Sequence, residues 1–159
     1  MTRPTPVDYG WMRVAIRLAY QCPPSPGAFS VGAVIVDRNG EEISRGYSRE
    51  TDSHVHAEES ALAKLARGDP RLKTATIYST LEPCSQRKSR PRTCTQLILA
   101  AGIPRVVMAW REPSLFVADC QSYELLADAG VVVVEIPDLA QEAQSPNIHL
   151  SLVFRRRDR

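Results

Sequence analysis

Apolar positions follow two periods along the chain, and the order in which these periods alternate predicts an α/β protein. Helical spacing of apolar residues occurs in four segments, 8–21, 55–67, 93–101 and 118–129. Compact or alternating apolar runs, typical of strands, occur in five segments, 31–36, 42–47, 75–80, 105–110 and 131–136. The resulting order, α-β-β-α-β-α-β-α-β, predicts a three-layer α/β/α fold in which helices cover both faces of a five-stranded mixed sheet.

Turn and capping residues set the expected ends of these elements. Asp8 can cap the first helix, and a proline cluster at 23–26 stops it. Asn39-Gly40 is a strong hairpin signal, so the first two strands should be antiparallel. The later strands are linked by helices and should run parallel with right-handed crossovers. Thr93 can cap the helix that follows it.

Composition is that of an ordinary globular protein, with 43% hydrophobic and 24% charged residues in 159 positions. No apolar run approaches the roughly 20 residues needed to span a bilayer, and the first residues lack the apolar segment of a secretory signal. We therefore expect a cytoplasmic protein with no membrane partner. A net charge of +2 gives no indication of nucleic-acid binding.

The chain is expected to form one domain over residues 1–136, followed by a C-terminal tail over residues 137–159. The tail is polar at first, apolar over 148–154 and basic at its end. Its apolar stretch could be a last strand or a helix, and it could pack on the domain or on a partner.

One His and two Cys residues carry the clearest chemical signal. His56 and Glu58 lie at the start of a predicted helix, Cys84 follows a predicted strand, and Cys94 begins the next predicted helix. Zn²⁺ accepts imidazole and thiolate ligands, and a catalytic zinc site keeps its fourth position for water. Bound zinc lowers the pKa of that water, and Glu58 could move its protons. We therefore predict Zn²⁺ held by His56, Cys84 and Cys94, with Glu58 as the catalytic residue.

A set of short motifs is spread over residues 25–131. They are Ser25-Pro26, Val31–Val36, Thr80–Ser85, Ala100–Ile103, Arg105–Val107, Glu112-Pro113, Val117-Ala118 and Leu125–Val131, together with the His-x-Glu pair and a wide gap between the two cysteines. This set resembles the pyrimidine deaminase domain of riboflavin biosynthesis, a branch of the zinc-dependent cytidine and deoxycytidylate deaminases. The resemblance implies the cytidine-deaminase-like fold, zinc at the three ligands, Glu58 as proton shuttle, and a homo-oligomer, which we expect to be a dimer.

The sequence departs from that family at positions that contact substrate there. The departures are Ser25–Ser30 in place of S-P-N-P, Gln86–Lys88 in place of His-His-Gly, and Glu112–Leu115 in place of D-P-N-P. Losing a buried hydrogen-bond partner changes specificity, so a different amino-heterocycle is predicted as substrate. Phe29, Glu112 and Ser114 are candidate contacts. Phe29 could stack on a flat ring, or it could fill the core.

Four cations lie between the two cysteines: Arg87, Lys88, Arg90 and Arg92. Guanidinium forks suit the oxygens of a phosphate, so these residues are further candidate substrate contacts and favour a phosphorylated substrate. A solvated basic loop is the other interpretation.

We predict hydrolytic deamination of a small amino-pyrimidine or related heterocycle, a nucleotide or nucleoside, with release of ammonia. Two other enzymes stay open: the riboflavin-pathway diaminohydroxyphosphoribosylaminopyrimidine deaminase itself, and a nucleic-acid base deaminase. The wide cysteine spacing and modest charge disfavour the latter. A non-enzymatic domain with structural zinc would need a fourth ligand, for which His54 is the candidate. Cys22 and Cys120 are expected to take no part.

Overall fold

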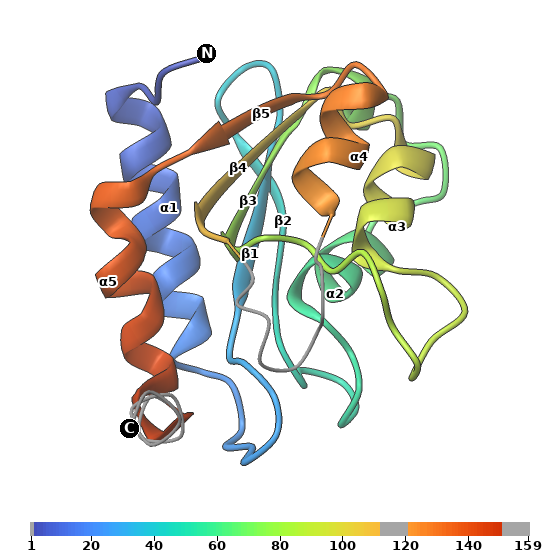
Figure 1. Cartoon of the computed structure of the whole chain (residues 1–159). Helices are drawn as coiled ribbons and strands as arrows, with labels where there is room; N and C mark the ends of the chain where they lie inside the picture. Colours follow the sequence, from blue (N-terminus) through green and yellow to red (C-terminus); the bar gives the residue numbers. More distant parts are fainter. Residues whose placement is uncertain (1, 112–120, 151–159) are drawn as a thin grey trace.

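The structure, a computed structural model, describes residues 2–111 and 121–150 and is built on one twisted sheet (Figure 1). Its strands are β1 Gly32–Val36, β2 Glu42–Tyr47, β3 Thr76–Leu81, β4 Arg105–Trp110 and β5 Val132–Glu135. They lie in the order β2-β1-β3-β4-β5. β1 is antiparallel to both β2 and β3, whereas β3, β4 and β5 run parallel. The predicted five-stranded mixed sheet is confirmed.

Helices cover both faces of this sheet, which gives the three predicted layers (Figure 1). On one face lie α1 Pro6–Ala19 and α5 Ala140–Gln144, and on the other lie α2 Ala57–Ala63, α3 Cys94–Ala101 and α4 Ser122–Asp128. Short 3-10 turns occupy Pro70–Thr74, Pro137–Leu139 and Ser145–Asn147. Within the described ranges, every helix is too short or too polar to cross a membrane.

Each face of the sheet has its own apolar core, because successive side chains of a strand point to opposite faces. Val34 and Tyr78 pack with Met12 of α1 on one face. Ile35 and Ile77 pack with the helices of the other face. The central strands are buried on both sides, which explains why β1 reads as an uninterrupted apolar run.

The start of α1 differs from the prediction that Asp8 caps it. Thr5 is the cap: its hydroxyl accepts a hydrogen bond from the Asp8 N–H, while the Asp8 carboxylate accepts one from the Thr5 N–H. The Asp8 carboxylate is almost fully buried and also accepts hydrogen bonds from Tyr78 and Arg105. Asp8 therefore joins α1 to the sheet, in addition to its part in the capping box at the start of the helix.

The helix predicted over residues 55–67 is shorter in the structure. His56 keeps an extended backbone, with φ −88° and ψ 161°, and its N–H donates to the Glu59 carboxylate at 3.2 Å. His56 is thus the N-cap and Ala57 the first helical residue. At the other end, the Leu65 N–H donates to the Leu62 carbonyl, a tighter bond that closes the last turn.

A glycine allows α2 to lie directly on β2. A Cβ atom added to Gly46 would lie 2.5 Å from the Ala57 carbonyl oxygen and 2.6 Å from the Ala61 nitrogen. Real side chains do not tolerate such contacts, so this close packing, which brings the start of α2 against the sheet, depends on glycine.

The remaining boundaries agree with the predictions to within a few residues. α1 ends at Ala19, two residues before the predicted end at Gln21, because the proline cluster follows closely. β2, β4 and α3 have the predicted bounds, including Thr93 as the N-cap of α3. α4 begins at Ser122; residues 118–120 of the predicted helix, with Cys120, lie outside the described residues.

The C-terminal segment packs on the body of the molecule as far as it is described. Leu139 and Ala143 belong to the apolar cluster beneath α1, and Leu150 packs with Phe29. Residues 148–150 are helical, and residues 151–159 lie outside the described ranges. The division of the chain at residue 136 stays a prediction.

Candidate metal site and cavity

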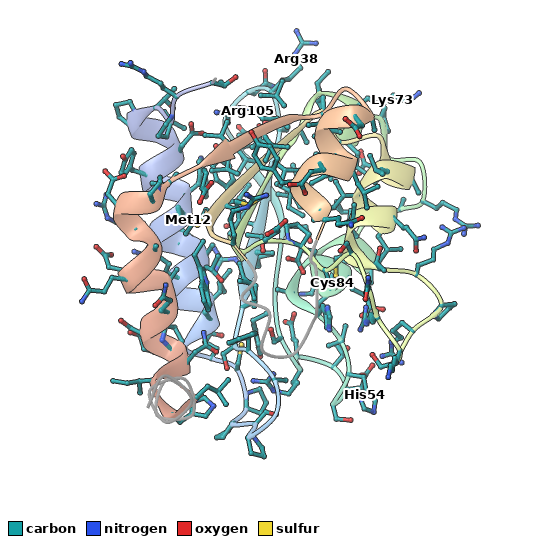
Figure 2. The ribbon with its side chains drawn as sticks, viewed as in Figure 1. Met12, Arg38, His54, Lys73, Cys84 and Arg105 are labelled. Atoms are coloured by element: carbon teal, nitrogen blue, oxygen red, sulfur yellow. The ribbon has the colours of Figure 1, made fainter. Side chains whose placement is uncertain are left out.

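The three predicted ligand residues come together where α2 and α3 begin. His56 caps α2, Cys94 is the first residue of α3, and Cys84 lies in the turn after β3. Their ligand atoms all lie within 4.8 Å of one another. Figure 2 shows Cys84 at the end of the sheet opposite to Arg105, as expected for residues at opposite ends of parallel strands.

The geometry of this cluster fits Zn²⁺. Tetrahedral zinc, with bonds of about 2.3 Å to sulfur and about 2.0 Å to nitrogen, requires a nitrogen-to-sulfur separation of roughly 3.5 Å. His56 Nδ1 lies 3.4 Å from Cys94 Sγ. Among the described residues, no fourth ligand joins the cluster, and His54 lies outside it. The cluster therefore offers three potential protein ligands, the number that a catalytic zinc centre uses, whereas a structural centre uses four.

The two thiols differ in acidity. The hydrogen bond with Cys94 lowers the pKa of the Cys84 thiol, burial opposes this shift, and His56 adds to it, so that the pKa is about 4. The pKa of the Cys94 thiol is raised by its hydrogen bond with Cys84, by burial and by the charge of Glu58. One sulfur is thus already anionic at neutral pH, which prepares the pair for a cation, since metal ligands bind as thiolates.

Glu58 lies in the first turn of α2, beside the metal cluster. The residue is only 3% exposed, and its Oε1 lies 2.6 Å from the Ser79 hydroxyl. The Ser79 hydroxyl also lies 2.8 Å from the Leu81 carbonyl oxygen. This contact orients a buried carboxylate toward the ligand cluster. The sequence analysis did not single out Ser79, because β3 also carries Thr76 and Thr80 and nothing in the sequence distinguishes one hydroxyl from the others.

A cavity of about 890 Å³ opens beside the metal cluster. The sequence-predicted residues that line it are Phe29, His56, Glu58, Cys84, Arg87 and Lys88. Arg90 and Arg92 do not belong to the lining. Glu112 and Ser114 lie outside the described residues, so their predicted role is not addressed by the structure.

Phe29 fills the core, as one of the two interpretations of the sequence predicted, and its stacking on a flat ring stays a prediction. It is buried in an apolar cluster with Val31, Leu81 and Leu150, and its ring meets the Trp110 ring edge-on at 5.4 Å. It also lines the cavity. The ring is therefore held firmly by packing while one part of it faces the cavity.

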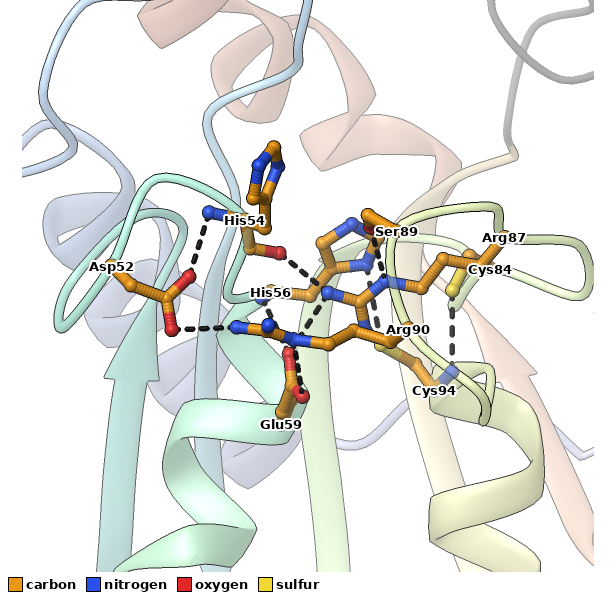
Figure 3. A network of polar contacts seen from close by, with 9 residues as sticks. All are labelled: Asp52, His54, His56, Glu59, Cys84, Arg87, Ser89, Arg90 and Cys94. Carbon is orange, nitrogen blue, oxygen red and sulfur yellow. Dashed lines mark hydrogen bonds and ion pairs between the residues drawn. The ribbon is translucent and has the colours of Figure 1, made fainter.

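Two arginines of the loop between the cysteines are paired with acidic side chains (Figure 3). Arg87 Nη2 lies 2.9 Å from Glu59 Oε1 and also donates to the His54 carbonyl, while Arg90 pairs with Asp52. We call these four side chains, Asp52, Glu59, Arg87 and Arg90, the clasp. Glu59 also accepts the His56 N–H, so the clasp ties the loop between the cysteines to the segment that carries the histidine.

The other two cations of this loop have no charged partner in the described part of the chain. Lys88 is exposed and lines the cavity, whereas Arg92 is exposed away from it. The Nη1 atom of Arg87 is buried without a hydrogen-bond partner among the described residues. The residues that line the cavity thus include Lys88, whose ammonium has no charged partner among the described residues, and Arg87, whose Nη1 group is unsatisfied there.

Glu82 also lines the cavity, and its buried carboxylate accepts a hydrogen bond from the Tyr123 N–H at 3.1 Å. It joins the end of β3 to the start of α4. His149 lies elsewhere, with its Nε2 2.8 Å from the Ser25 carbonyl oxygen.

Comparison with known families and sequences gives one consistent result. The family model described as the cytidine and deoxycytidylate deaminase zinc-binding region matches residues 6–110. The chain is 45% identical over 127 residues to the diaminohydroxyphosphoribosylamino-pyrimidine deaminase of Schizosaccharomyces pombe, covering 79% of this chain and 31% of that protein. It is 33% identical over 118 residues to the cytosine deaminase of Candida albicans, covering 72% and 71%. The chain spans about a third of the length of several of these relatives.

Solved structures agree with the fold. The chain superposes on RibD of Acinetobacter baumannii with a TM-score of 0.74 at 31% identity, covering 89% of this chain and 38% of that one. The deaminase/reductase of Thermotoga maritima gives a TM-score of 0.76 at 29% identity, covering 94% and 42%. Both likenesses confirm the predicted three-layer α/β architecture.

Proposed function

Because the chain belongs to the cytidine and deoxycytidylate deaminase zinc-binding family, we propose that it hydrolyses the exocyclic amine of a small amino-pyrimidine or related heterocycle and releases ammonia. Membership of this zinc-binding family confirms zinc as the cofactor. The observation that carries the proposal is the meeting of His56, Cys84 and Cys94 with the buried Glu58 at one cavity.

The chain's own residues supply binding and proton transfer. His56, Cys84 and Cys94 would hold Zn²⁺, which when bound supplies a Lewis acid that activates water at neutral pH. Glu58 takes one proton from the attacking water and passes it to a ring nitrogen. It then takes the remaining proton from the hydroxyl of the tetrahedral intermediate and delivers it to the amine, so that the C–N bond breaks, ammonia leaves and the carbonyl forms. Ser79 holds one oxygen of that carboxylate, so the position of the carboxylate is fixed before substrate arrives.

The residues that line the cavity favour a substrate with a flat ring and an anionic substituent. Phe29 offers an aromatic surface on one side. Lys88 and the unsatisfied Nη1 of Arg87 offer donors on another side, and both suit a phosphate. Arg90 and Arg92 lie outside the cavity lining, so among the four loop cations we assign phosphate binding to Lys88 and to the Nη1 group of Arg87, which the clasp leaves without a partner.

A second candidate is deamination of diaminohydroxyphosphoribosylaminopyrimidine itself. The identity of 45% to the S. pombe deaminase named for that compound favours it. The substitutions around Phe29 and Arg87 favour a different ring. Both candidates use the same zinc centre and differ only in the cavity.

We further propose that the protein acts as a homodimer in the cytoplasm. Val132 on the edge strand β5 and Leu125 on α4 are exposed apolar residues that could contribute to such a contact. Light scattering after size-exclusion chromatography would give the assembly, and fractionation of cells would give the location.

The test of function is ammonia release by the zinc-loaded protein. The panel should contain cytosine as the free base, cytidine paired with CMP, deoxycytidine paired with dCMP, and diaminohydroxyphosphoribosylaminopyrimidine paired with its dephosphorylated form. Activity on one compound that is lost in Glu58→Gln would support the mechanism and name the substrate. No ammonia from any compound, with one zinc bound per chain, would overturn the proposal.

A further inference from the structure

One wall of the cavity is an irregular segment, of which only the last residue, Val31, bonds to the edge of the sheet, through its N–H and carbonyl to Ser48. Residues 23–31 contain no helix or strand, yet Gly27, Ala28, Phe29 and Val31 all line the cavity. An irregular segment keeps a defined shape only if its backbone groups find partners elsewhere. The position of Phe29 therefore depends on what binds the backbone around it.

The first anchor of this segment is Arg49. Its guanidinium donates to the Pro23 carbonyl at 2.8 Å, to the Phe29 carbonyl at 3.1 Å and to the Ser30 hydroxyl at 2.9 Å. Arg49 itself has a φ of 61°, a conformation that side chains other than glycine rarely adopt. The backbone strain at Arg49 is sustained by these contacts, which bind both ends of the segment.

The second anchor comes from the far end of the chain. The Asn147 side chain accepts the Ser30 N–H at 2.5 Å and donates to the Ser30 carbonyl at 3.1 Å. One amide thus satisfies both backbone groups of a single residue, as a neighbouring strand would. Asn147 is only 4% exposed, so water does not replace these bonds.

Leu150 reinforces the same wall by packing. It is only 2% exposed and belongs to the cluster that contains Phe29, Val31, Ala57 and Leu81. Neither Asn147 nor Leu150 lines the cavity, so any influence on a bound molecule must act through the segment that they hold.

We propose that Asn147, together with Leu150, is a positioning residue for substrate. It fixes the cavity wall formed by residues 23–31, which we call the Phe29 wall. The C-terminal segment thereby sets affinity for the heterocycle, while the metal centre is independent of it. The proposal rests on the proposed function, because the molecule that meets the Phe29 wall is the substrate of the zinc centre. It adds a role for a part of the chain that contributes no catalytic group.

The test compares Asn147→Ala and Leu150→Ala with wild type and with Gln144→Ala, an exposed position in the same segment. Amide hydrogen exchange of the zinc-loaded proteins is measured first, since it needs no substrate. In Asn147→Ala, exchange over residues 25–31 should rise by about tenfold or more, while peptides around His56 and Cys94 keep their protection. Gln144→Ala should match wild type.

Kinetics then test the consequence for substrate, using the compound that wild type deaminates best. KM should rise about tenfold in Asn147→Ala and in Leu150→Ala, with kcat within about twofold and one zinc per chain. The double variant should show little more than the larger single effect, because both residues act through one segment. Leu150→Ala keeps the test decisive should Asn147→Ala fail to fold.

Three results would overturn the inference. Unchanged exchange over residues 25–31 would mean that Asn147 does not hold the wall. Raised exchange with unchanged KM would mean that the wall does not govern binding. Loss of zinc in the variants would mean that the C-terminal segment supports the whole site. Failure of wild type to deaminate any compound would refute the proposed function and the claim on affinity together, while the exchange data would still decide whether Asn147 holds the segment.

Discussion

The buried carboxylate of Asp8 predicts a measurable loss of stability in acid. It accepts hydrogen bonds of 2.8 Å from the Thr5 N–H, the Tyr78 hydroxyl and both terminal nitrogens of Arg105. Burial raises the pKa of Asp8, but the hydrogen bonds from Arg105, Thr5 and Tyr78 and the charge of Arg105 outweigh it and lower the pKa from 3.8 to about 2. The folded protein thus holds this proton less tightly than the unfolded chain does.

The direction and size of the effect follow from that difference. A carboxylate with a depressed pKa in the folded state contributes stability that is present above pH 4 and is lost as the pH falls toward 2. The shift to about 2 corresponds to about 2 kcal/mol at neutral pH, of which about 1 kcal/mol should be gone at pH 3. Folding free energies of single domains are small, so this loss is large enough to measure.

The assay is urea unfolding of wild type and Asp8→Asn between pH 7 and pH 3, with the metal chelated so that ligand protonation does not enter. The two free energies of unfolding should differ most at pH 7, and the gap should narrow by about 1 kcal/mol at pH 3. Tyr78→Phe removes one of the donors to Asp8. The free energy of unfolding of this variant should therefore fall by less between pH 7 and pH 3 than that of wild type. A gap that is equal at pH 7 and pH 3 would refute the reasoning, because the carboxylate would then contribute nothing that depends on its charge.

Four further predictions concern the site. Glu58→Gln should lower kcat by at least about 100-fold while one zinc stays bound, and loss of zinc by atomic absorption would instead make Glu58 a ligand. Glu59→Ala should weaken zinc affinity about 10- to 100-fold in a chelator competition, because Glu59 binds both Arg87 and the His56 N–H. The control Glu42→Ala, which breaks an exposed ion pair with Arg45, should leave zinc affinity unchanged. Equal affinities in the two variants would show that the clasp does not support His56. Gly46→Ala should destabilise the fold by about 1–3 kcal/mol, since its Cβ would meet α2, and an unchanged Tm would contradict that close approach. Chelation of zinc should lower Tm and abolish turnover, and added zinc should restore both; activity that survives chelation would exclude a catalytic metal.

Features with local signals were predicted well from the sequence. The Asn39-Gly40 turn fixes the hairpin of β1 and β2, and Thr93 fixes the start of α3, because each acts on residues a few positions away. The meeting of His56, Cys84 and Cys94 was predictable for a similar reason, because each lies next to a helix or strand that the sequence indicates, while their role as zinc ligands stays a prediction. The start of α2 was predicted two residues too early, because the hydrogen bond from the His56 N–H to the Glu59 carboxylate places the N-cap at His56.

Features that depend on distant partners were not predicted. Asp8 read as a helix cap, but its main partner is Arg105, 97 positions away. Asn147 read as part of a polar tail, but it completes the backbone of Ser30, 117 positions away. Nothing in the identity of an aspartate or asparagine names such a partner. These partners are known only from the fold, which brings Asp8 next to Arg105 and Asn147 next to Ser30.

The loop between the cysteines shows how partners change the meaning of charge. Four cations there suggested a strongly basic clamp, but Arg87 and Arg90 are balanced by Glu59 and Asp52. Lys88 is then the unpaired loop cation that, among the described residues, faces the cavity. A polynucleotide needs several phosphate contacts for useful affinity, whereas a single phosphate needs one cation and a few N–H donors. The ion pairs therefore argue against a nucleic-acid substrate more directly than the net charge does, and they favour a small molecule with one anionic group.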